Sequence, residues 1–547
     1  MSDDERPDPT PEVPEQTPDM EETPEAAEAS DAAEAREATD PEHASPEGEA
    51  DAAPSSGIGR TVTVISLRVV RGLAGLASAV ALIAAVGLLP LPSVGVTPLG
   101  TPVEPEAADL LALCPGAALR LGDETGADAG QAYAVGSGEL NVVADRTPTS
   151  TSLTSSAVGG PAQAPTLLRL APAPTAALAA TQTQRLDGEG GLRGLMVASC
   201  TEPSSSAWLV GGDTTLGRTT LLLLANPTAV EAEVAVQVWG ESGPVTAPGM
   251  KGIKVPANGQ RVLALTGFAP DLASPVVHVE ARGGQVVAAL QTSVTRVLDP
   301  GGVDIVSSGA SPSTKIVIPA VRIEDAAGVG SSLGLEGYAD LEAIVRVGNP
   351  GEVTADVEVS VSPTFPGGVA TSFHLHVAPG QVLDTALAAA LELGADPFVD
   401  GSYTVTLESN APVVAGARTA TTPAPTTDAD GVIQPGGADL AWFASAPRLT
   451  GDVALAVADA PNPVLVAASM DGGVHTVTLT PIGGGDPLTL EVPGVGSVAL
   501  PVESGAGYRV QGARGVAIAV SFADTGALAG YPLRSPRAAD DMLVVRP

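Results

Sequence analysis

NPTAVEAEVAVQV, residues 226–238, and NPGEVTADVEVSV, residues 349–361, are the two stretches that decide the fold. The second repeats the first at a constant offset of 123 residues, and each begins with Asn-Pro, a dipeptide that marks a turn. After the turn, apolar and polar residues alternate. The apolar positions are Ala232, Val234, Val236 and Val238 in the first copy, and Ala355, Val357, Val359 and Val361 in the second. This period of two predicts half-buried antiparallel strands.

The similarity between the copies continues past these strands. Pro and Gly at 256–260 and at 379–381 precede further apolar runs, and they mark a turn before another strand. Each copy then ends in a hairpin-like pair, at 276–289 and at 403–417. A third stretch shows a weaker similarity to the first two copies, at residues 490–500 and 508–520. Its head is expected at Ala441-Trp442-Phe443, by correspondence with Ala207-Trp208-Leu209 in the first copy.

Short strands joined by Gly, Pro and Asn turns are typical of two-sheet antiparallel β-sandwiches, and units of 100 to 125 residues have the size of one such domain. We therefore expect a mainly β protein with tandem β-sandwich domains at residues 206–312, 313–428 and 429–547. A single closed propeller is the structural alternative. It fits poorly, because propeller blades repeat every 40–50 residues or so.

An apolar run, GLAGLASAVALIAAVGLL at residues 72–89, predicts one transmembrane helix within residues 60–96. Eighteen residues at 1.5 Å each nearly span a hydrocarbon core of roughly 30 Å. Arg60, Arg68 and Arg71 precede the run, so the N-terminus is expected in the cytoplasm and the bulk of the chain outside. A cleaved signal peptide is the alternative. The long leader and the missing Ala-x-Ala site favour an uncleaved signal-anchor in the plasma membrane.

The leader before this helix, residues 1–59, contains nineteen Asp or Glu and only two Arg, with few apolar side chains. Such a segment cannot bury enough surface to offset its ordering entropy, so we expect a disordered acidic cytoplasmic tail. The whole chain has a formal net charge of −37. A surface of that sign repels phosphate backbones, which argues against nucleic acid as a partner.

Cys114 and Cys200 are the chain's two cysteines, and both follow the expected anchor. In an oxidising compartment the default is one disulfide, which would staple a β-rich region at residues 97–205. This region includes a stretch rich in Ser, Thr and Pro with little capacity to form a core. A redox or metal role would need CxxC spacing or a neighbouring His, and neither is present.

The acidic leader, single anchor, CPG motif at Cys114–Gly116 and later Cys200 resemble an uncharacterised family of exported actinobacterial proteins. The block from Ala207 to Val245 shares this resemblance, and its most specific part is GRTTLLLLANP, residues 217–227. The resemblance implies location and architecture. It implies no catalytic residues, because the family is a domain of unknown function.

Motifs for chemistry are sparse. No S-x-x-K motif or P-loop occurs, so we expect no enzyme activity, no catalytic residues and no cofactor. His374 and His376 share one strand face, and Asp428 and Asp430 have part of a calcium-loop rhythm, but further ligands are missing from both, so no metal site is expected. The tryptophans, expected as packing residues rather than a sugar-binding face, are Trp208, Trp239 and Trp442.

These features together predict a non-enzymatic, membrane-anchored protein of the cell envelope, acting as an extracellular scaffold, interaction or adhesion module. Its partner is expected to be another envelope protein or a wall polymer, met at strand edges or at the loops of the sandwich ends. The alternative is an envelope hydrolase that cleaves glycan or peptide with paired acidic residues.

Overall fold

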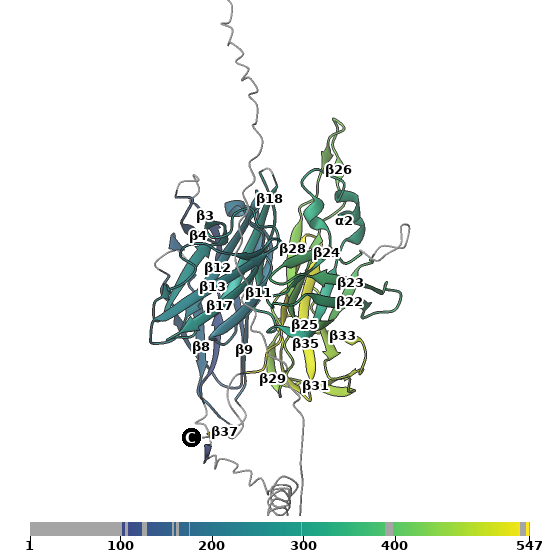
Figure 1. Cartoon of the computed structure of the whole chain (residues 1–547). Helices are drawn as coiled ribbons and strands as arrows, with labels where there is room; N and C mark the ends of the chain where they lie inside the picture. Colours follow the sequence, from purple (N-terminus) through teal and green to yellow (C-terminus); the bar gives the residue numbers. More distant parts are fainter. Residues whose placement is uncertain are drawn as a thin grey trace, which may run out of the picture. The chain divides into compact units, whose positions relative to one another are not determined.

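The computed structural model describes residues 101–103, 108–122, 128–155, 158–159, 163–173, 176–296, 298–388, 398–536 and 543–545. The expected acidic tail at 1–59 and the expected anchor at 60–96 lie outside these residues. Among the residues described, no helix is long and apolar enough to cross a bilayer. The described strands belong to one compact unit, Pro98–Pro547, and they make the protein mainly β, as the sequence predicts (Figure 1).

The alternating stretches form the predicted strands, β13 (Ala232–Gly240) and β22 (Ala355–Pro363). In each strand the side that carries the alternating apolar residues faces a core. Val234, Val236 and Val238 are almost completely buried, whereas Gln237, between the last two, is exposed. Burying a valine stabilises the folded chain by about 2 kcal/mol, so the period of two fixes which face of each strand turns inward.

The Asn-Pro turns before these strands are also equivalent. Asn226 is buried, and its Nδ2 donates to the carbonyl oxygens of Val230 (2.8 Å) and Val255 (3.1 Å). Asn349 repeats this with Val353 (2.7 Å) and Val377 (2.9 Å). In both turns the buried side-chain amide of Asn bonds to backbone carbonyl oxygens and so closes the turn. This role explains why Asn recurs at the same position in both copies.

Residues 206–306 form a pair of antiparallel sheets around one core, called sandwich II. One sheet contains β11 (Ser206–Val210), β17 (Val276–Arg282), β13, β14 (Gly243–Val245) and β15 (Ile253–Val255). The other has the order β16 (Gly259–Ala264), β12 (Arg218–Asn226), β18 (Val287–Arg296), β19 (Asp299–Val306).

Sandwich III, residues 313–444, has the same plan, but one long strand, β25 (Gly401–Thr421), belongs to both sheets. Its first half lies between β20 (Ser313–Ile323) and β22, with β23 (Thr371–Val377) at the edge. Its second half lies between β28 (Asp439–Ala444) and β21 (Ile344–Gly348), with β24 (Val382–Ala386) at the edge.

Trp442 therefore lies in sandwich III. The sequence suggested that Ala441-Trp442-Phe443 heads the next unit, but β28 pairs with β25 over residues 416–421 and closes the second sheet of sandwich III. It is the counterpart of β19, not of β11. Cross-strand pairing overrides a three-residue similarity.

Sandwich IV, residues 453–532, repeats the plan around its own core. One sheet has the order β29 (Val453–Ala456), β34 (Gly507–Gln511), β31 (His475–Pro481), β32 (Leu488–Val492). The other has the order β33 (Ser497–Pro501), β30 (Val464–Ser469), β35 (Val516–Asp524), β36 (Ala527–Pro532).

The stapled region before these three is a reduced copy of the same sandwich, called sandwich I. Its sheets have the orders β2 (Leu110–Cys114), β8 (Thr166–Leu170), β6 (Thr149–Ser152) and β10 (Arg193–Ser199), β9 (Leu178–Asp187), β5 (Glu139–Ala144). Each of these sheets has three strands where sandwich IV has four. The strands without a counterpart in sandwich I are those equivalent to β32 and β33. Part of the connecting segment instead reaches sandwich II, where Thr154 bridges to Gly259.

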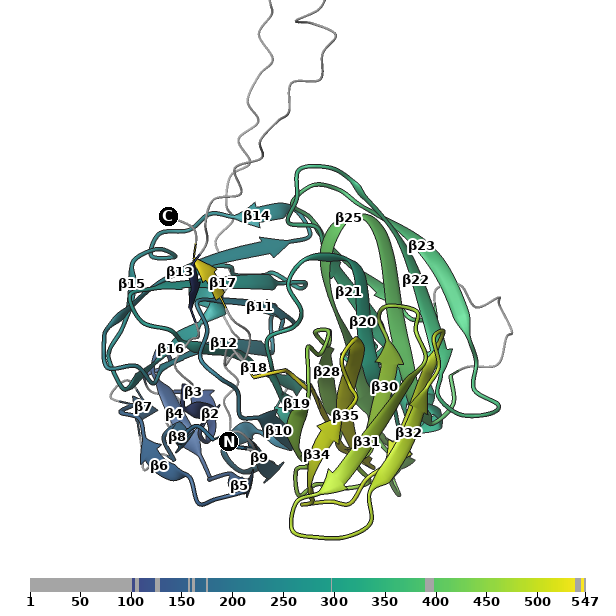
Figure 2. The same ribbon diagram turned by 90° about the horizontal axis from the view of Figure 1, so that it is seen from below.

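The four sandwiches close into a ring around their last strands. β10 contacts β19 and β36, and β28 also contacts both, so these four strands meet at the centre. Figure 2 shows sandwiches I to IV following one another around this centre in sequence order. Buried apolar clusters fill the seams between I and II, between II and III, and between III and IV. Asn141 of β5 closes the last seam by donating to the carbonyl oxygens of Val457 (2.7 Å) and Gly505 (3.0 Å).

Smaller elements decorate this ring. They are the sheet β3 (Ala118–Leu121), β4 (Ala132–Val135), β7 (Val158–Gly159), the ribbon β26 (Thr426–Thr427) with β27 (Ile433–Gln434), the pair β1 (Thr101–Val103) with β37 (Leu543–Val545), helix α2 (Ala326–Ser332), and short 3-10 turns at Glu189–Gly191, Leu265–Gly267 and Ala339–Leu341.

Candidate functional site

The predicted disulfide is present and joins the two sheets of sandwich I. Cys114 ends β2 and Cys200 follows β10; their Cα atoms are 4.3 Å apart across a sequence separation of 86 residues. Both cysteines are buried among Leu168, Ala180 and the other residues of the small core of this sandwich. The bond therefore reinforces a core that is smaller than those of sandwiches II to IV.

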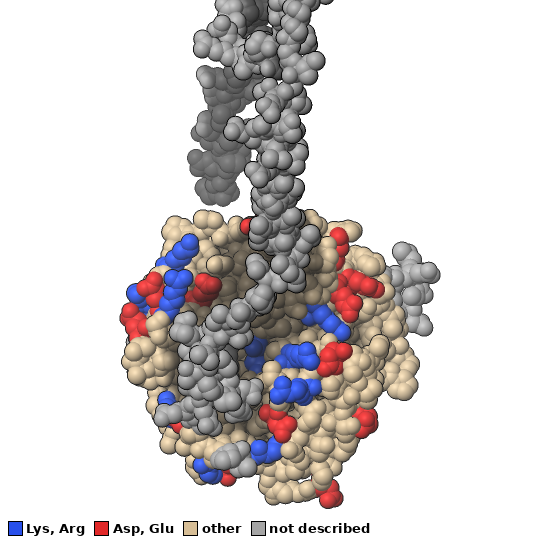
Figure 3. All heavy atoms as spheres, turned by 60° about the horizontal axis from the view of Figure 1, so that its bottom comes forward, with Lys and Arg blue, Asp and Glu red and all other residues tan. Residues whose placement is uncertain are grey.

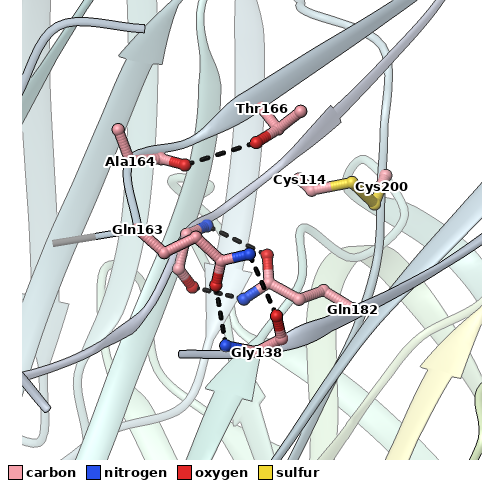
Figure 4. The surroundings of a disulfide bond; sticks show 8 residues. Cys114, Gly138, Gln163, Ala164, Thr166, Gln182 and Cys200 are labelled. Atoms are coloured by element: carbon pink, nitrogen blue, oxygen red, sulfur yellow. Dashed lines mark hydrogen bonds between the residues drawn. A yellow bond between two sulfur atoms is a disulfide. The ribbon is translucent and has the colours of Figure 1, made fainter. Parts of the chain in front are cut away.

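Buried and half-buried glutamine side chains hold backbone segments around this core (Figure 4). The Gln182 side chain accepts from Gly116 N (3.1 Å) and donates to Gly116 O, while Gln163 makes the same reciprocal pair with Gly138 (2.7 and 2.9 Å). Gln291 of β18 does this for Leu119, whose N donates to Gln291 Oε1 at 2.8 Å. Each amide satisfies the backbone N–H and C=O of a residue distant in the sequence, and no local sequence pattern marks these contacts.

Arg346 crosses the seam between sandwiches II and III and is fully buried. Its guanidinium forms a bidentate pair with Asp384 (2.7 and 2.8 Å) and donates to carbonyl oxygens of sandwich II, those of Gly212 (2.9 Å), Ala273 (2.8 Å) and Pro275 (3.1 Å). It also stacks on the Trp442 ring at 4.5 Å. Trp442 is thus a packing residue, as predicted from the sequence.

Two carboxylates are buried at the ring centre. Asp439 of β28 accepts from the backbone N–H groups of Leu195 (2.8 Å), Leu528 (2.9 Å) and Val303 (3.3 Å), and so joins all four sandwiches. Complete burial raises the pKa of Asp439 to about 8, although these N–H donors oppose the rise. Burial likewise raises the pKa of Asp304 to about 7, opposed by the N–H of Trp442, which lies 2.7 Å from Asp304 Oδ2.

Neither carboxylate lines a described pocket. In the part of the chain that the structure describes, Asp304 Oδ1 has no hydrogen-bond partner. This pair organises the centre of the ring and does not form the solvent-accessible acid pair that the hydrolase alternative requires.

A cleft of about 750 Å³ lies between sandwich I and sandwich IV. One wall is β5, of which four consecutive residues, 141–144, line the cleft. Because side chains of consecutive strand residues point to opposite faces, a run of four along the wall means that the strand edge itself faces the cleft. The other wall is the loop 481–486 with residues 503–508, and it includes three glycines with positive φ at 483–485.

The cleft is acidic and partly apolar. Asp486 and Glu503 line it and are exposed, and among its described lining residues none is Lys, Arg or His. Val142 and Leu488 add exposed apolar surface, with 39% and 37% of the residue accessible respectively. Sequence analysis missed this cleft. Its only signal was the Ser/Thr/Pro-rich stretch after β5.

The face turned forward in Figure 3 has a different character. Lys and Arg side chains gather in and around a hollow near its middle, while most Asp and Glu lie toward the rim. A separate small cavity of about 120 Å³ is lined by Cys200, Arg534 and other residues of sandwiches I, II and IV. Arg534 donates to the carbonyl oxygens of Ser308 and Gly309 there, so it links sandwich II to the C-terminal end of sandwich IV.

The histidines weighed as metal ligands lie on β23, an edge strand. Both are exposed on one face, as predicted; His376 Nδ1 lies 2.6 Å from Asp356 Oδ1, and His374 stands opposite Glu358. In the described residues no group of three or more His, Cys, Asp or Glu is arranged to hold a metal ion.

Asp428 closes its own turn. It accepts from the N–H groups of Asp430 (3.0 Å) and Val432 (2.9 Å) and from Gln434 Nε2 (3.0 Å), which together lower its pKa. Trp208 and Trp239 stack on one another with ring centroids 5.3 Å apart, beside the seam of sandwiches II and III. These contacts are local and structural.

Comparison with known proteins gives one family. The sequence pattern of a group described as "Family of unknown function (DUF5719)" matches residues 154–503, more than half of the chain. No curated protein matches. A solved structure described as "Crystal structure of tetra-tandem repeat in extending region of large adhesion protein" is 12% identical and covers 72% of this chain and 98% of its own, with a TM-score of 0.11. A superposition that loose supports no inference.

Proposed function

The chain belongs to DUF5719, a family of unknown function, and from that premise we propose that it is a non-enzymatic, membrane-anchored interaction module of the cell envelope. The observation that carries the proposal is the acidic cleft beside β5, where a strand edge borders a concave surface. Strand edges and clefts between domains are common peptide- and protein-binding sites.

The rigidity of the ring supports a scaffold role. Asp439 bonds to both sandwiches that flank the cleft, and the disulfide joins the two sheets of sandwich I, so both walls belong to bodies held by buried contacts. A preorganised surface binds a partner with less loss of conformational freedom.

An extracellular location is part of the same proposal. Residues 72–89 would form the anchor, Arg60, Arg68 and Arg71 would keep the tail inside, and a disulfide is typical of an oxidising compartment. The partner would be a second envelope protein or a wall polymer. An actinobacterial origin agrees with the Ala-, Gly- and Asp-rich composition, in which Lys occurs three times.

Affinity capture from native envelope tests this function. Full-length protein, cross-linked in place and purified in detergent, should recover one stoichiometric envelope protein or bind purified wall polymer. A matched sample with the acidic tail alone, residues 1–59, should recover neither. If the full chain also recovers neither, the interaction function is wrong.

The hydrolase alternative has one observation in its favour, because Asp486 and Glu503 line the same cleft. Purified protein should then release soluble sugar or peptide from wall material, and Asp486→Asn or Glu503→Gln should abolish the release. Product formation that depends on both residues would overturn the non-enzymatic proposal.

A further inference from the structure

Sandwich I lacks a strand that its three counterparts possess. In sandwiches II, III and IV the strand equivalent to β5 has an outer neighbour, which is β16, β24 or β33 respectively. In the described residues no strand pairs with the outer edge of β5. The segment that would supply it runs to Thr154, which bridges to Gly259 of sandwich II instead.

The backbone groups at this edge can be assigned from the pairing. Cys200 N donates to Ala180 O, so Ala180 directs its backbone groups toward β10. These directions alternate along a strand, so the neighbours of Ala180 bond to β5, where they stand opposite Asn141 and Val143. Leu140, Val142 and Ala144 therefore direct their N–H and C=O groups away from β9, toward the open edge.

The cleft provides a second wall beside that edge. The loop 481–486 faces residues 141–144 across the cleft, and at Gly483 and Gly484 even an added Cβ would meet no atom within 4 Å. There is room here for a chain that pairs with β5. Its side chains on the Val142 side would cover Leu140 and Leu178, which pack against the small core around the disulfide and are only partly buried.

The charge of the cleft selects the occupant. Asp486 and Glu503 line it, and none of its described lining residues is Lys, Arg or His, so an approaching peptide gains from carrying positive charge. The strand that fills this position in sandwich II, β16, has the sequence GQRVLA and itself carries Arg261. The sequence of β16 therefore serves as a model for the peptide that would pair with β5.

We propose that β5 of sandwich I accepts an extended, positively charged peptide segment of a partner protein as its missing outer strand. This inference rests on the proposed interaction function and specifies its site and partner class. Backbone hydrogen bonds to Leu140, Val142 and Ala144 would supply affinity, and Asp486 and Glu503 would select charge.

The test uses a fluorescent synthetic peptide with the sequence of residues 256–267, PANGQRVLALTG, titrated into the full-length protein in detergent. Val142→Pro removes one outward N–H, so binding should weaken at least about tenfold, while Val142→Thr, which keeps that N–H, should bind like wild type. Absence of binding to wild type, or equal binding by Val142→Pro, would overturn the proposal.

A second variant guards against misfolding of the proline protein. Asp486→Lys with Glu503→Lys leaves the strand intact and should reverse the charge preference. The peptide altered by Arg261→Glu should then bind better than the original, whereas wild type should prefer the original. An unchanged preference would contradict the assigned role of the two carboxylates.

Capture from native envelope separates this inference from the broader function. If Val142→Pro loses the partner that wild type recovers, strand addition is supported. If Val142→Pro recovers the same partner, the interaction function stands and strand addition at β5 is wrong. Recovery of a second copy of the chain alone would show self-association and overturn the proposed occupant.

Discussion

Arg346 and Asp384 form a bidentate ion pair, 2.7 and 2.8 Å long, at the seam between sandwiches II and III. The arginine is fully buried, and its remaining N–H groups donate to three carbonyl oxygens of sandwich II. Burial raises the pKa of Asp384, but Arg346 more than offsets this and holds that pKa below its ordinary value. The pair therefore fixes one sandwich against the next.

Arg346→Ala should strongly destabilise the ring. It leaves the Asp384 charge and three carbonyl oxygens without their donor, and breaking a buried pair in this way costs about 3–5 kcal/mol. Lys254→Ala is the control. Both Lys254 and its partner Glu233 are exposed, so the substitution should leave the free energy of unfolding nearly unchanged. Urea unfolding of both variants checks this, and equal stabilities would contradict the assigned role of Arg346.

Gly194→Ala should disrupt the ring centre. An added Cβ would meet Asp439 Oδ1 at 2.1 Å, and the backbone there has a φ of +131°, so we expect a loss of at least about 2 kcal/mol. Gly130→Ala, where a Cβ meets nothing within 4 Å, should change stability by less than about 1 kcal/mol. Thermal unfolding that ranks the two variants the other way would refute the packing at Asp439.

Gln291→Leu should destabilise the seam between sandwiches I and II. The variant leaves the N–H and C=O of Leu119 buried without their partner, which costs about 1–3 kcal/mol for each orphaned group. Hydrogen exchange at the Leu119 amide should accelerate at the same time. Gln511→Leu, at an exposed position, is the matched control. Faster exchange at the Leu119 amide in both variants would argue against a specific contact between Gln291 and Leu119.

Asp304→Asn should change how stability depends on pH. The pKa of Asp304 is about 7 in the folded protein and near 4 in the unfolded chain, so the folded state binds the extra proton between these values. Rising pH through this window therefore removes stability, and most of the loss has occurred above pH 7 or so.

Asparagine does not titrate, so the Asp304→Asn variant does not lose this part of its folding stability as the pH rises. Relative to wild type, Asp304→Asn should be within about 1 kcal/mol at pH 5 and more stable by about 3 kcal/mol at pH 9. Urea unfolding at both values measures the difference, in which the other titrating groups cancel. A constant difference would mean that Asp304 titrates normally in the fold.

The strands of sandwiches II and III were predictable because their signal is local. Val234 and Val357 lie in strict alternations, and burial of one face follows from the period alone. The disulfide was equally predictable, because a chain with two cysteines offers a single internal pairing. These predictions needed no knowledge of distant contacts.

The ring, and the sandwich form of the stapled region (sandwich I), were not predictable in this way. Asp439 meets Leu195 across 244 residues, and nothing in either local sequence marks that contact. In sandwich I, β6 has the sequence TSTS with all four residues exposed, so it lacks the alternation that revealed the other copies. The cleft depends on a strand that is missing, and a missing element leaves no motif to read.

Topology in intact cells tests the central claim most directly. Val495 is 92% exposed on a loop of sandwich IV, and Ala27 belongs to the acidic leader. A membrane-impermeant maleimide should label Val495→Cys on intact cells. It should label Ala27→Cys only after the cells have been permeabilised. Labelling of Ala27→Cys from outside, or protection of Val495→Cys until the cells are opened, would contradict an exported interaction module.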